Sequence, residues 1–436
     1  MTRYPGEEEH SPARRQILLG GVSAVLGWFL GGGSALAQIV LNPPRTQRKG
    51  DVLVCLFLRG GADGLNVVVP YAEDAYYRNR PSLAIPAPND RRRSAGERAI
   101  ALNDLFALHP AMKPLYPLYA EGKLAIVHAC GSMEKSRSHF EAMSAMERGV
   151  AEAKASIGTG WIARHLLSVP RKGSSPLRAV AFSNVLPESL RGITDAVVLQ
   201  TLSDFRLAMP KSMGITQAEE LQHTLREMYA QAGKHEVSQT AQDTLQVLQA
   251  LQRVDPSRYR PAGGAVYPHS ELGRGLKQVA ALIRAQVGLE VACLDKGGWD
   301  THVAQGSTAG WMAANLTDLA QSLSAFARDM GEQMRHITLV AMTEFGRRVR
   351  ENSGLGTDHG RAGVMLVLGG GIRGGKVYAR WPGLEPHQLE EPGDLRVTTD
   401  YREVLAEVVC KRLGNPHVAR VFPGVNVRRL GALGLI

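Results

Sequence analysis

Continuous runs of apolar residues alternate with helical patterns along most of this 436-residue chain. Strands that are covered on both faces are expected to be apolar throughout, without alternating polar positions. The strand-like runs are 52–58, 124–129, 179–182, 289–294, 337–342 and 364–368. Apolar residues recur at helical spacing before two of these runs, at 276–283 and 316–326. The alternation predicts an α/β fold with a doubly wound, mostly parallel sheet flanked by helices.

The pattern changes between about residues 205 and 260, where two helical stretches follow one another without a strand-like run. Thr216 and Glu219 have the spacing of a capping box at the start of the first stretch. We therefore predict one α/β domain over residues 38–436, with a helical insertion at about 205–260. A last helix is expected after Asp400, which would serve as its N-cap or as a ligand.

The N-terminus has the features of a targeting segment. Arg14 and Arg15 form a twin-arginine pattern, and the apolar, glycine-rich stretch that follows ends in Ala35-Leu36-Ala37, a small-x-small cleavage site. We predict a twin-arginine (Tat) signal peptide over residues 1–37, recognised by the Tat translocase, and a periplasmic or secreted mature protein. The alternative is a membrane anchor, because the stretch is close to the length that crosses a bilayer. The glycines and the cleavage site favour a mature chain without a stable membrane span.

The charge of the chain indicates which partners to expect. The formal net charge is +10, and the predicted signal peptide contributes nothing to it, because its arginines are balanced by glutamates. A basic mature protein favours an anionic small-molecule or polymer substrate. Aromatic residues are only 6% of the chain and do not alternate with basic residues, so no nucleic-acid partner is expected. Val377 replaces the Ser or Thr that a phosphate loop at 370–376 would require, which argues against a nucleotide triphosphatase.

Acidic residues near glycines follow several predicted strands, twice together with a histidine. These residues are Asp63, Asp300 with His302, Glu344, and Asp358 with His359. Loops outside the carboxyl ends of the strands of an open α/β sheet can direct several side chains at one point, and carboxylates and imidazoles bind divalent cations. We predict that these residues are ligands of one or two divalent metal ions, with zinc, manganese, magnesium and calcium as candidates. Taken singly, each acid also fits a turn or a helix cap.

A candidate nucleophile lies after the second apolar run. Ser138 precedes a helical stretch, and the amide groups at a helix N-terminus stabilise an alkoxide or a bound anion. Beside a metal ion, its hydroxyl can act as a nucleophile. A glutamate three residues further on also completes a capping box, and the two roles are compatible. Proton transfer is assigned to His139 or Asp358, and anion binding to Arg347 or Arg137.

In combination, these motifs resemble an exported bacterial family of unknown function, number 1501 among such domains, which is placed in the alkaline phosphatase and sulfatase superfamily. The resemblance rests on the twin-arginine leader and on residues 57–66, 137–140, 298–302, 344–347 and 356–360. It implies an alkaline-phosphatase-like parallel sheet, a binuclear metal site, and a Ser, Thr or formylglycine nucleophile at a helix start. It also implies hydrolysis of a phosphate or sulfate ester.

By position, the resemblance implies that Asp63, Asp300 and His302 are metal ligands and that Ser138 is the nucleophile. Phe345 stands where the superfamily has a histidine ligand. Either Asp358 and His359 together replace that ligand, or His359 alone acts as the later metal histidine, and Glu344 and Asp358 compete for one role.

Two functions therefore follow as hypotheses. The first is an exported metal-dependent hydrolase of phosphate or sulfate esters. The alternative is a non-catalytic exported envelope protein that binds a polymer or partner through a degenerate site, as Phe345 and the helical insertion suggest. A metal-free hydrolase built on Ser138 and His139 ranks last, because neighbouring residues rarely face each other correctly.

Overall fold

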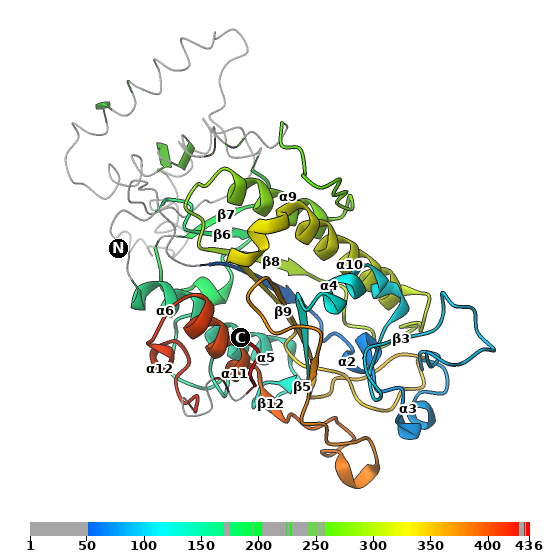
Figure 1. The fold of residues 1–436 in the computed structure, drawn as a ribbon. Helices are drawn as coiled ribbons and strands as arrows, with labels where there is room; N and C mark the ends of the chain where they lie inside the picture. Colours follow the sequence, from blue (N-terminus) through cyan, green and yellow to red (C-terminus); the bar gives the residue numbers. More distant parts are fainter. Residues whose placement is uncertain are drawn as a thin grey trace, which may run out of the picture.

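A nine-stranded mixed sheet forms the centre of the computed structural model, which describes residues 51–169, 175–194, 196–202, 258–426, 431 and 433–436, with isolated positions between 203 and 257. The strand order is β11-β5-β10-β9-β1-β8-β6-β7, and β12 also pairs with β5 (Figure 1). The bounds are β1 Val52–Leu58, β5 Leu124–Gly131, β6 Ala179–Phe182, β7 Ala196–Leu199, β8 Val291–Lys296, β9 Ile337–Met342, β10 Gly363–Gly369, β11 Val377–Tyr378 and β12 Thr399–Asp400. A small antiparallel sheet joins β2 Val68–Val69, β4 Ala107–Leu108 and β3 Ile100–Ala101.

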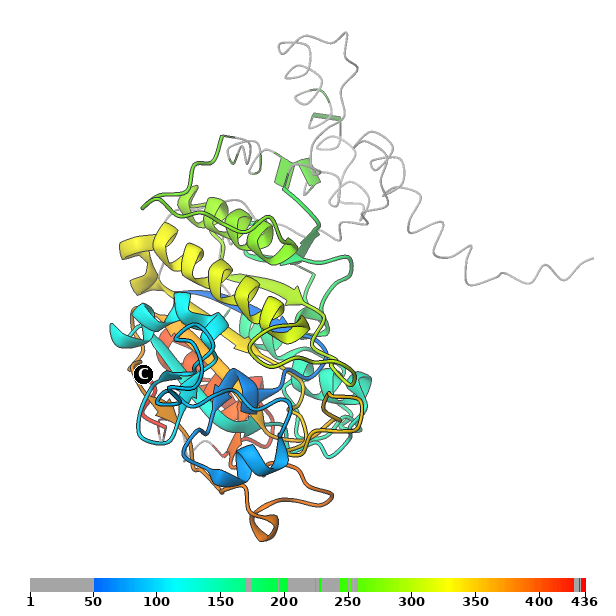
Figure 2. The same cartoon turned by 90° about the vertical axis from the view of Figure 1, so that its right-hand side faces the viewer.

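Helices cover both faces of the large sheet, so alternate residues of its central strand enter two different cores. Val54 packs in one core with Leu276 of α9 and Leu316 of α10. Phe57 packs in the other core with Trp161 of α6. Figures 1 and 2 show α9 and α10 side by side, and α5, α6, α11 and α12 lie on the opposite face of the sheet (Figure 1). The protein is thus a three-layer α/β structure.

The described helices differ widely in length. Their bounds are α2 Gly64–Val67, α3 Asp74–Asn79, α4 Tyr116–Ala120, α5 His139–Arg148, α6 Trp161–Ser168, α9 Glu271–Arg284, α10 Trp311–Met330, α11 Tyr401–Glu407 and α12 Val418–Val421. The 3-10 helices are η1 Pro110–Leu115, η2 Glu188–Leu190, η3 Gly331–His336 and η4 Pro386–Gln388, and η5 Val408–Arg412 is a π-helix. Over the part of the chain that is described, no helix is both long and apolar enough to cross a membrane.

The direction of one strand determines where the connecting loops meet. β1 pairs in parallel with β8 and β9, so the carboxyl ends of these three strands lie at one edge of the sheet. β10 runs antiparallel to both β9 and β5. Its amino end therefore lies at the same edge as the carboxyl ends of its neighbours, and residues that precede β10 can join residues that follow β1, β8 and β9.

The predicted mostly parallel sheet flanked by helices is confirmed, and β1, β6 and β9 begin and end where the apolar runs do. The sequence pattern did not predict β7, the two-residue strands β11 and β12, or the reversed direction of β10. Asp400 is the N-cap of α11, and its carboxylate accepts the amide of Arg402. The predicted signal peptide lies outside the described residues, as does the helical insertion at about 205–260 apart from isolated positions and its end.

Candidate metal centre

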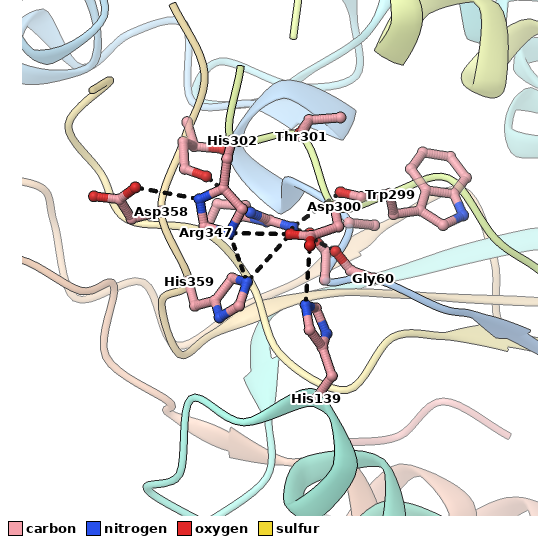
Figure 3. A network of polar contacts seen from close by, with 12 residues as sticks. Gly60, His139, Trp299, Asp300, Thr301, His302, Arg347, Asp358 and His359 are labelled. Carbon is pink, nitrogen blue, oxygen red and sulfur yellow. Dashed lines mark hydrogen bonds and ion pairs between the residues drawn. The ribbon is translucent and has the colours of Figure 1, made fainter. Parts of the chain in front are cut away.

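Four side chains from three separate parts of the chain meet at the carboxyl edge of the sheet. Asp300 and His302 lie in the loop after β8, His359 precedes β10, and His139 is the first residue of α5 (Figure 3). His139, Asp300 and His359 each offer a ligand atom, and these atoms lie within 4.8 Å of one another. His302 completes the group, because its Nε2 is 2.8 Å from Nε2 of His359.

The carboxylate of Asp300 is at the centre of the group. Its Oδ1 lies 3.1 Å from Nε2 of both His302 and His359, and its Oδ2 lies 3.4 Å from Nε2 of His139. Nε2 of His139 is buried and makes no hydrogen bond. The three imidazoles thus present the same ring nitrogen to one carboxylate. This is a histidine and aspartate group that can bind a metal ion.

The other nitrogen of each imidazole ring is held by an acceptor outside the group. Nδ1 of His139 lies 2.7 Å from Oε1 of Glu344, and Nδ1 of His302 lies 3.3 Å from Oδ1 of Asp358. Nδ1 of His359 lies 2.8 Å from the backbone oxygen of Arg137. Such contacts fix the orientation and tautomer of histidines that bind metals. Glu344 and Asp358, predicted as ligands, therefore contact the Nδ1 side of two histidines, away from the Nε2 atoms that face Asp300.

Glu344 is buried, and several hydrogen bonds fix its carboxylate beside His139. Its Oε1 also accepts the amide of Gly60 at 2.8 Å, and its Oε2 accepts the hydroxyl of Thr343 at 3.0 Å. Burial alone would raise the pKa of Glu344, but the hydrogen bond from His139 and those from its other donors hold the pKa below its ordinary value. The same hydrogen bond raises the pKa of His139.

Arg347 fixes Asp300 and the surrounding loops. Its buried guanidinium donates to Oδ1 of Asp300 at 2.7 Å and to the backbone oxygens of Gly61 at 2.7 Å and Thr357 at 2.8 Å. It also donates to the backbone oxygens of Gly60 and Trp299. Partial burial opposes ionisation of Asp300, but the hydrogen bond and positive charge of Arg347, together with the neighbouring histidines, lower its pKa to about 2. Arg347 was predicted to bind a substrate anion, yet its donors are occupied by the protein itself.

Asp63 lies outside the group and is part of a buried ion pair. Both of its oxygens accept from Arg80, at 2.5 and 3.0 Å, and the side chains of both residues are fully buried. Its Oδ2 also accepts from Nε2 of Gln305 at 2.7 Å. The structure therefore does not bring this predicted ligand to the other ligands. Asp63 therefore has a structural role, as the buried partner of Arg80 and Gln305.

Gln305 links this ion pair to the loops of the group, and sequence reasoning did not identify it. Its side-chain oxygen accepts the hydroxyls of Thr301 at 2.8 Å and Thr357 at 2.7 Å. Thr301 lies between Asp300 and His302, and Thr357 lies two residues before His359. A buried amide that connects distant loops has no local sequence signature, because its partners are far away in the chain.

Ser138 is the N-cap residue of α5, but its side chain makes no capping hydrogen bond. The predicted capping box is not formed, because the carboxylate of Glu141 accepts the hydroxyl of Ser136 instead. Ser138 is half-buried next to His139, and its hydroxyl is not used by the helix. Phe345 packs against the group, with its ring centroid 4.9 Å from that of His139 and 4.8 Å from that of His359.

The fold and this group define an α/β protein with a candidate metal centre at the carboxyl edge of its sheet. The model of one family, described as "Protein of unknown function (DUF1501)", matches residues 51–408. The chain therefore belongs to the DUF1501 family, as the sequence motifs indicated. A comparison with curated proteins found no match.

Proposed function

We propose that the protein is an exported metal-dependent hydrolase of phosphate or sulfate esters with a single metal ion. The observation that carries the proposal is the convergence of three histidine Nε2 atoms on Asp300 while every Nδ1 faces an acceptor. The α/β fold and the basic charge of the chain support the class of substrate.

The protonation of the histidines supports a cation at their centre. A backbone oxygen only accepts hydrogen bonds, so Nδ1 of His359 carries the proton and its Nε2 is bare. The carboxylates of Glu344 and Asp358 favour the same tautomer in His139 and His302. Three bare nitrogens and a carboxylate would then face one another, which is unfavourable without a positive charge between them.

The set of ligands favours zinc among the predicted metals. Imidazole nitrogens suit zinc, whereas magnesium and calcium prefer oxygen ligands. Three histidines and one aspartate would hold such an ion, with Glu344 and Asp358 orienting two of the histidines. A divalent cation at this site would supply polarisation of an ester oxygen and a lower pKa for a bound water molecule.

The remaining roles fall to residues beside the group. Ser138 can supply the nucleophilic hydroxyl, since it adjoins His139 and its side chain is free of the helix cap. Arg347 positions Asp300 and the loops that carry the ligands. An alkaline-phosphatase-like architecture is part of the proposal, with one departure: Phe345 fills the space beside His139 and His359 where a further ligand would stand.

Export through the twin-arginine pathway and release into the periplasm or medium complete the proposal. They rest on Arg14, Arg15 and the cleavage site that ends at Ala37. Delivery of a folded chain would suit a protein whose site joins residues 139 and 359.

The test combines metal analysis with turnover by the purified full chain. We expect about one zinc per chain and hydrolysis of 4-nitrophenyl phosphate or 4-nitrophenyl sulfate that a chelator abolishes and zinc restores. Asp300→Asn and Ser138→Ala should each remove most turnover, while Ser353→Ala serves as a control for handling. Full turnover by chelated protein would contradict the proposal, and so would the absence of any bound or rebound metal.

The non-catalytic alternative keeps one specific support, which is Phe345 at the position of a ligand. If that alternative holds, the protein binds one metal ion per chain but hydrolyses neither ester. Loss of turnover in Ser138→Ala with metal retained would exclude it.

A further inference from the structure

Two arginines beside the candidate metal centre retain unused hydrogen-bond donors. In the part of the chain that the structure describes, the guanidinium of Arg348 makes no hydrogen bond. It forms only long ion pairs, with Oδ2 of Asp358 at 3.9 Å and Oδ1 of Asp394 at 4.0 Å. Arg137 donates from one terminal nitrogen to Asp394 and to the backbone oxygen of Glu391, and its Nε has no partner. Each of the two side chains is 35% exposed, so solutes can reach part of both guanidinium groups, although the Nε atoms are buried.

The carboxylate of Asp394 holds these arginines together. Its side chain is fully buried, it forms an ion pair with Arg137, and its Oδ1 accepts no hydrogen bond. Arg348 and Asp394 also form a backbone bridge, so the turn that carries Asp394 is tied to the segment after β9. The carboxylates of Asp394 and Asp358 lie 3.9–4.0 Å from the guanidinium of Arg348, too far to use its hydrogen-bond donors. The planar fork of an arginine matches the oxygens of phosphate, sulfate and carboxylate groups.

The position of the pair relative to the metal centre decides which anion it binds. The backbone oxygen of Arg137 accepts from His359, and Arg348 approaches the carboxylate of Asp358 that orients His302. The two arginines therefore border the side of the centre formed by His302 and His359. Asp358 stands between Arg348 and His302, so Arg348 faces a group some distance from a reacting ester at the metal.

We propose that Arg137 and Arg348 form a clamp for a second anionic group of the substrate. The substrate is then a polyanionic ester, in which a further sulfate, phosphate or carboxylate group lies several atoms from the ester that is cleaved. This inference rests on the proposed function, because it assigns the substrate class of the same site. It places the anion contact on residues other than Arg347, whose donors are occupied.

A binding experiment separates the clamp from catalysis. Zinc-loaded protein is titrated with benzenesulfonate and with benzene-1,3-disulfonate, which carry one and two anionic groups and have no cleavable ester. We expect the disulfonate to bind about tenfold more tightly, the effect of one charged hydrogen-bonding contact. Arg348→Gln should remove this preference. Arg350→Gln should keep it, because Arg350 is an exposed arginine in the same segment. Arg348→Gln breaks no hydrogen bond, so its folding and zinc content should match those of the parent.

The outcomes for the clamp and for the hydrolase are distinct. Equal affinity for the two sulfonates overturns the clamp, and so does a preference for the disulfonate that persists in Arg348→Gln. After either result, turnover of a simple aryl ester still supports the hydrolase. A preference for the disulfonate that depends on Arg348, in a protein that cleaves no ester, supports an anion site and overturns its assignment to a substrate. Among hydrolysed esters, Arg348→Gln should raise KM about tenfold for a doubly anionic ester and leave a singly anionic one within about twofold.

Discussion

Nε2 of His302 and Nε2 of His359 lie 2.8 Å apart, and Oδ1 of Asp300 lies 3.1 Å from each of them. These three atoms form a nearly equilateral triangle. Imidazole nitrogens and a carboxylate oxygen at this spacing would hold a zinc ion. His139 approaches the second oxygen of Asp300 and would be a further ligand.

Removing one corner of this triangle should remove the metal. We expect His359→Ala to retain far less than one zinc per chain by elemental analysis after gel filtration. A chelator should lower the melting temperature of the parent, because ligand at about 100 times its Kd stabilises a fold by about 2.7 kcal/mol. It should leave the melting temperature of His359→Ala unchanged. His269→Ala, at an exposed histidine, is the matched control. Normal zinc content in His359→Ala would exclude this ligand assignment.

Glu344→Gln should weaken metal binding without removing the site. The amide still accepts a hydrogen bond, but it no longer supplies the negative charge that orients and polarises His139. Loss of such an outer partner typically lowers metal affinity by about 10- to 100-fold. Competition with a zinc indicator measures the change. Glu332→Gln, at an exposed glutamate, should have no effect, and an unchanged affinity in Glu344→Gln would show that His139 is not a ligand.

Arg80→Met should destabilise the fold, because it leaves the carboxylate of Asp63 buried without its partner. Breaking a buried pair from one side typically costs about 3–5 kcal/mol. Urea denaturation measures this loss in the chelated protein. Arg92→Met removes an exposed partner of Asp90, with an arginine side chain that is 89% exposed, and should change stability little. Similar effects of the two substitutions would mean that the buried ion pair between Asp63 and Arg80 does not stabilise the fold.

Acidification should destabilise the protein through two buried histidines. Burial lowers the pKa of His109 and of His128 from 6.5 to about 4, so both are neutral in the fold at neutral pH. The unfolded chain takes up protons on them first, and their contribution to stability is therefore complete above about pH 6.5 and lost as the pH falls toward 4. Each contributes at most about 1.4 kcal/mol per pH unit. In chelated protein, His128→Gln should reduce the slope of unfolding free energy against pH between 6.5 and 4.5, and an unchanged slope would contradict the assignment.

Gly60→Ala should disturb the loop that carries Asp300. Gly60 has φ of +118°, and a Cβ there would lie 2.7 Å from the backbone nitrogen of Asp300. Gly264 also has a positive φ, of +68°, but nothing lies within 4 Å of its Cβ position. Gly264→Ala therefore measures backbone strain alone, about 1–2 kcal/mol. We expect Gly60→Ala to lose more stability and also zinc, and zinc content equal to that of Gly264→Ala would argue against this contact.

The strands could be predicted from the sequence because a strand covered on both faces is apolar at every position, as in β1 and β9. The direction of β10 could not, since an apolar run looks the same in parallel and antiparallel pairings. Very short strands such as β12 depend on a neighbour for their existence, so no local pattern marks them.

For the site too, residues in local motifs could be predicted, whereas contacts between distant segments could not. The histidine and aspartate motifs indicated that Asp300, His302 and His359 would gather, and the structure brings them together. Whether an acid reaches the centre or contacts a histidine from outside depends on the path of its loop: Asp300 follows β8 at some distance, whereas Glu344 comes soon after β9. The pairing of Asp63 with Arg80 joins the residue before α2 to the C-terminal end of α3, and no motif marks it.

The reversal of β10 also affects how the site is assembled during folding. β9 and β10 are antiparallel neighbours joined by one excursion of the chain, so Glu344, Arg347, Asp358 and His359 come together through contacts that are local in sequence. Local contacts form faster than distant ones, because less chain entropy is lost in closing them. His139 and Asp300 must arrive from remote segments. His359 and the residues that orient the other ligands can thus form with this hairpin, while affinity for metal develops only when the rest of the sheet has closed.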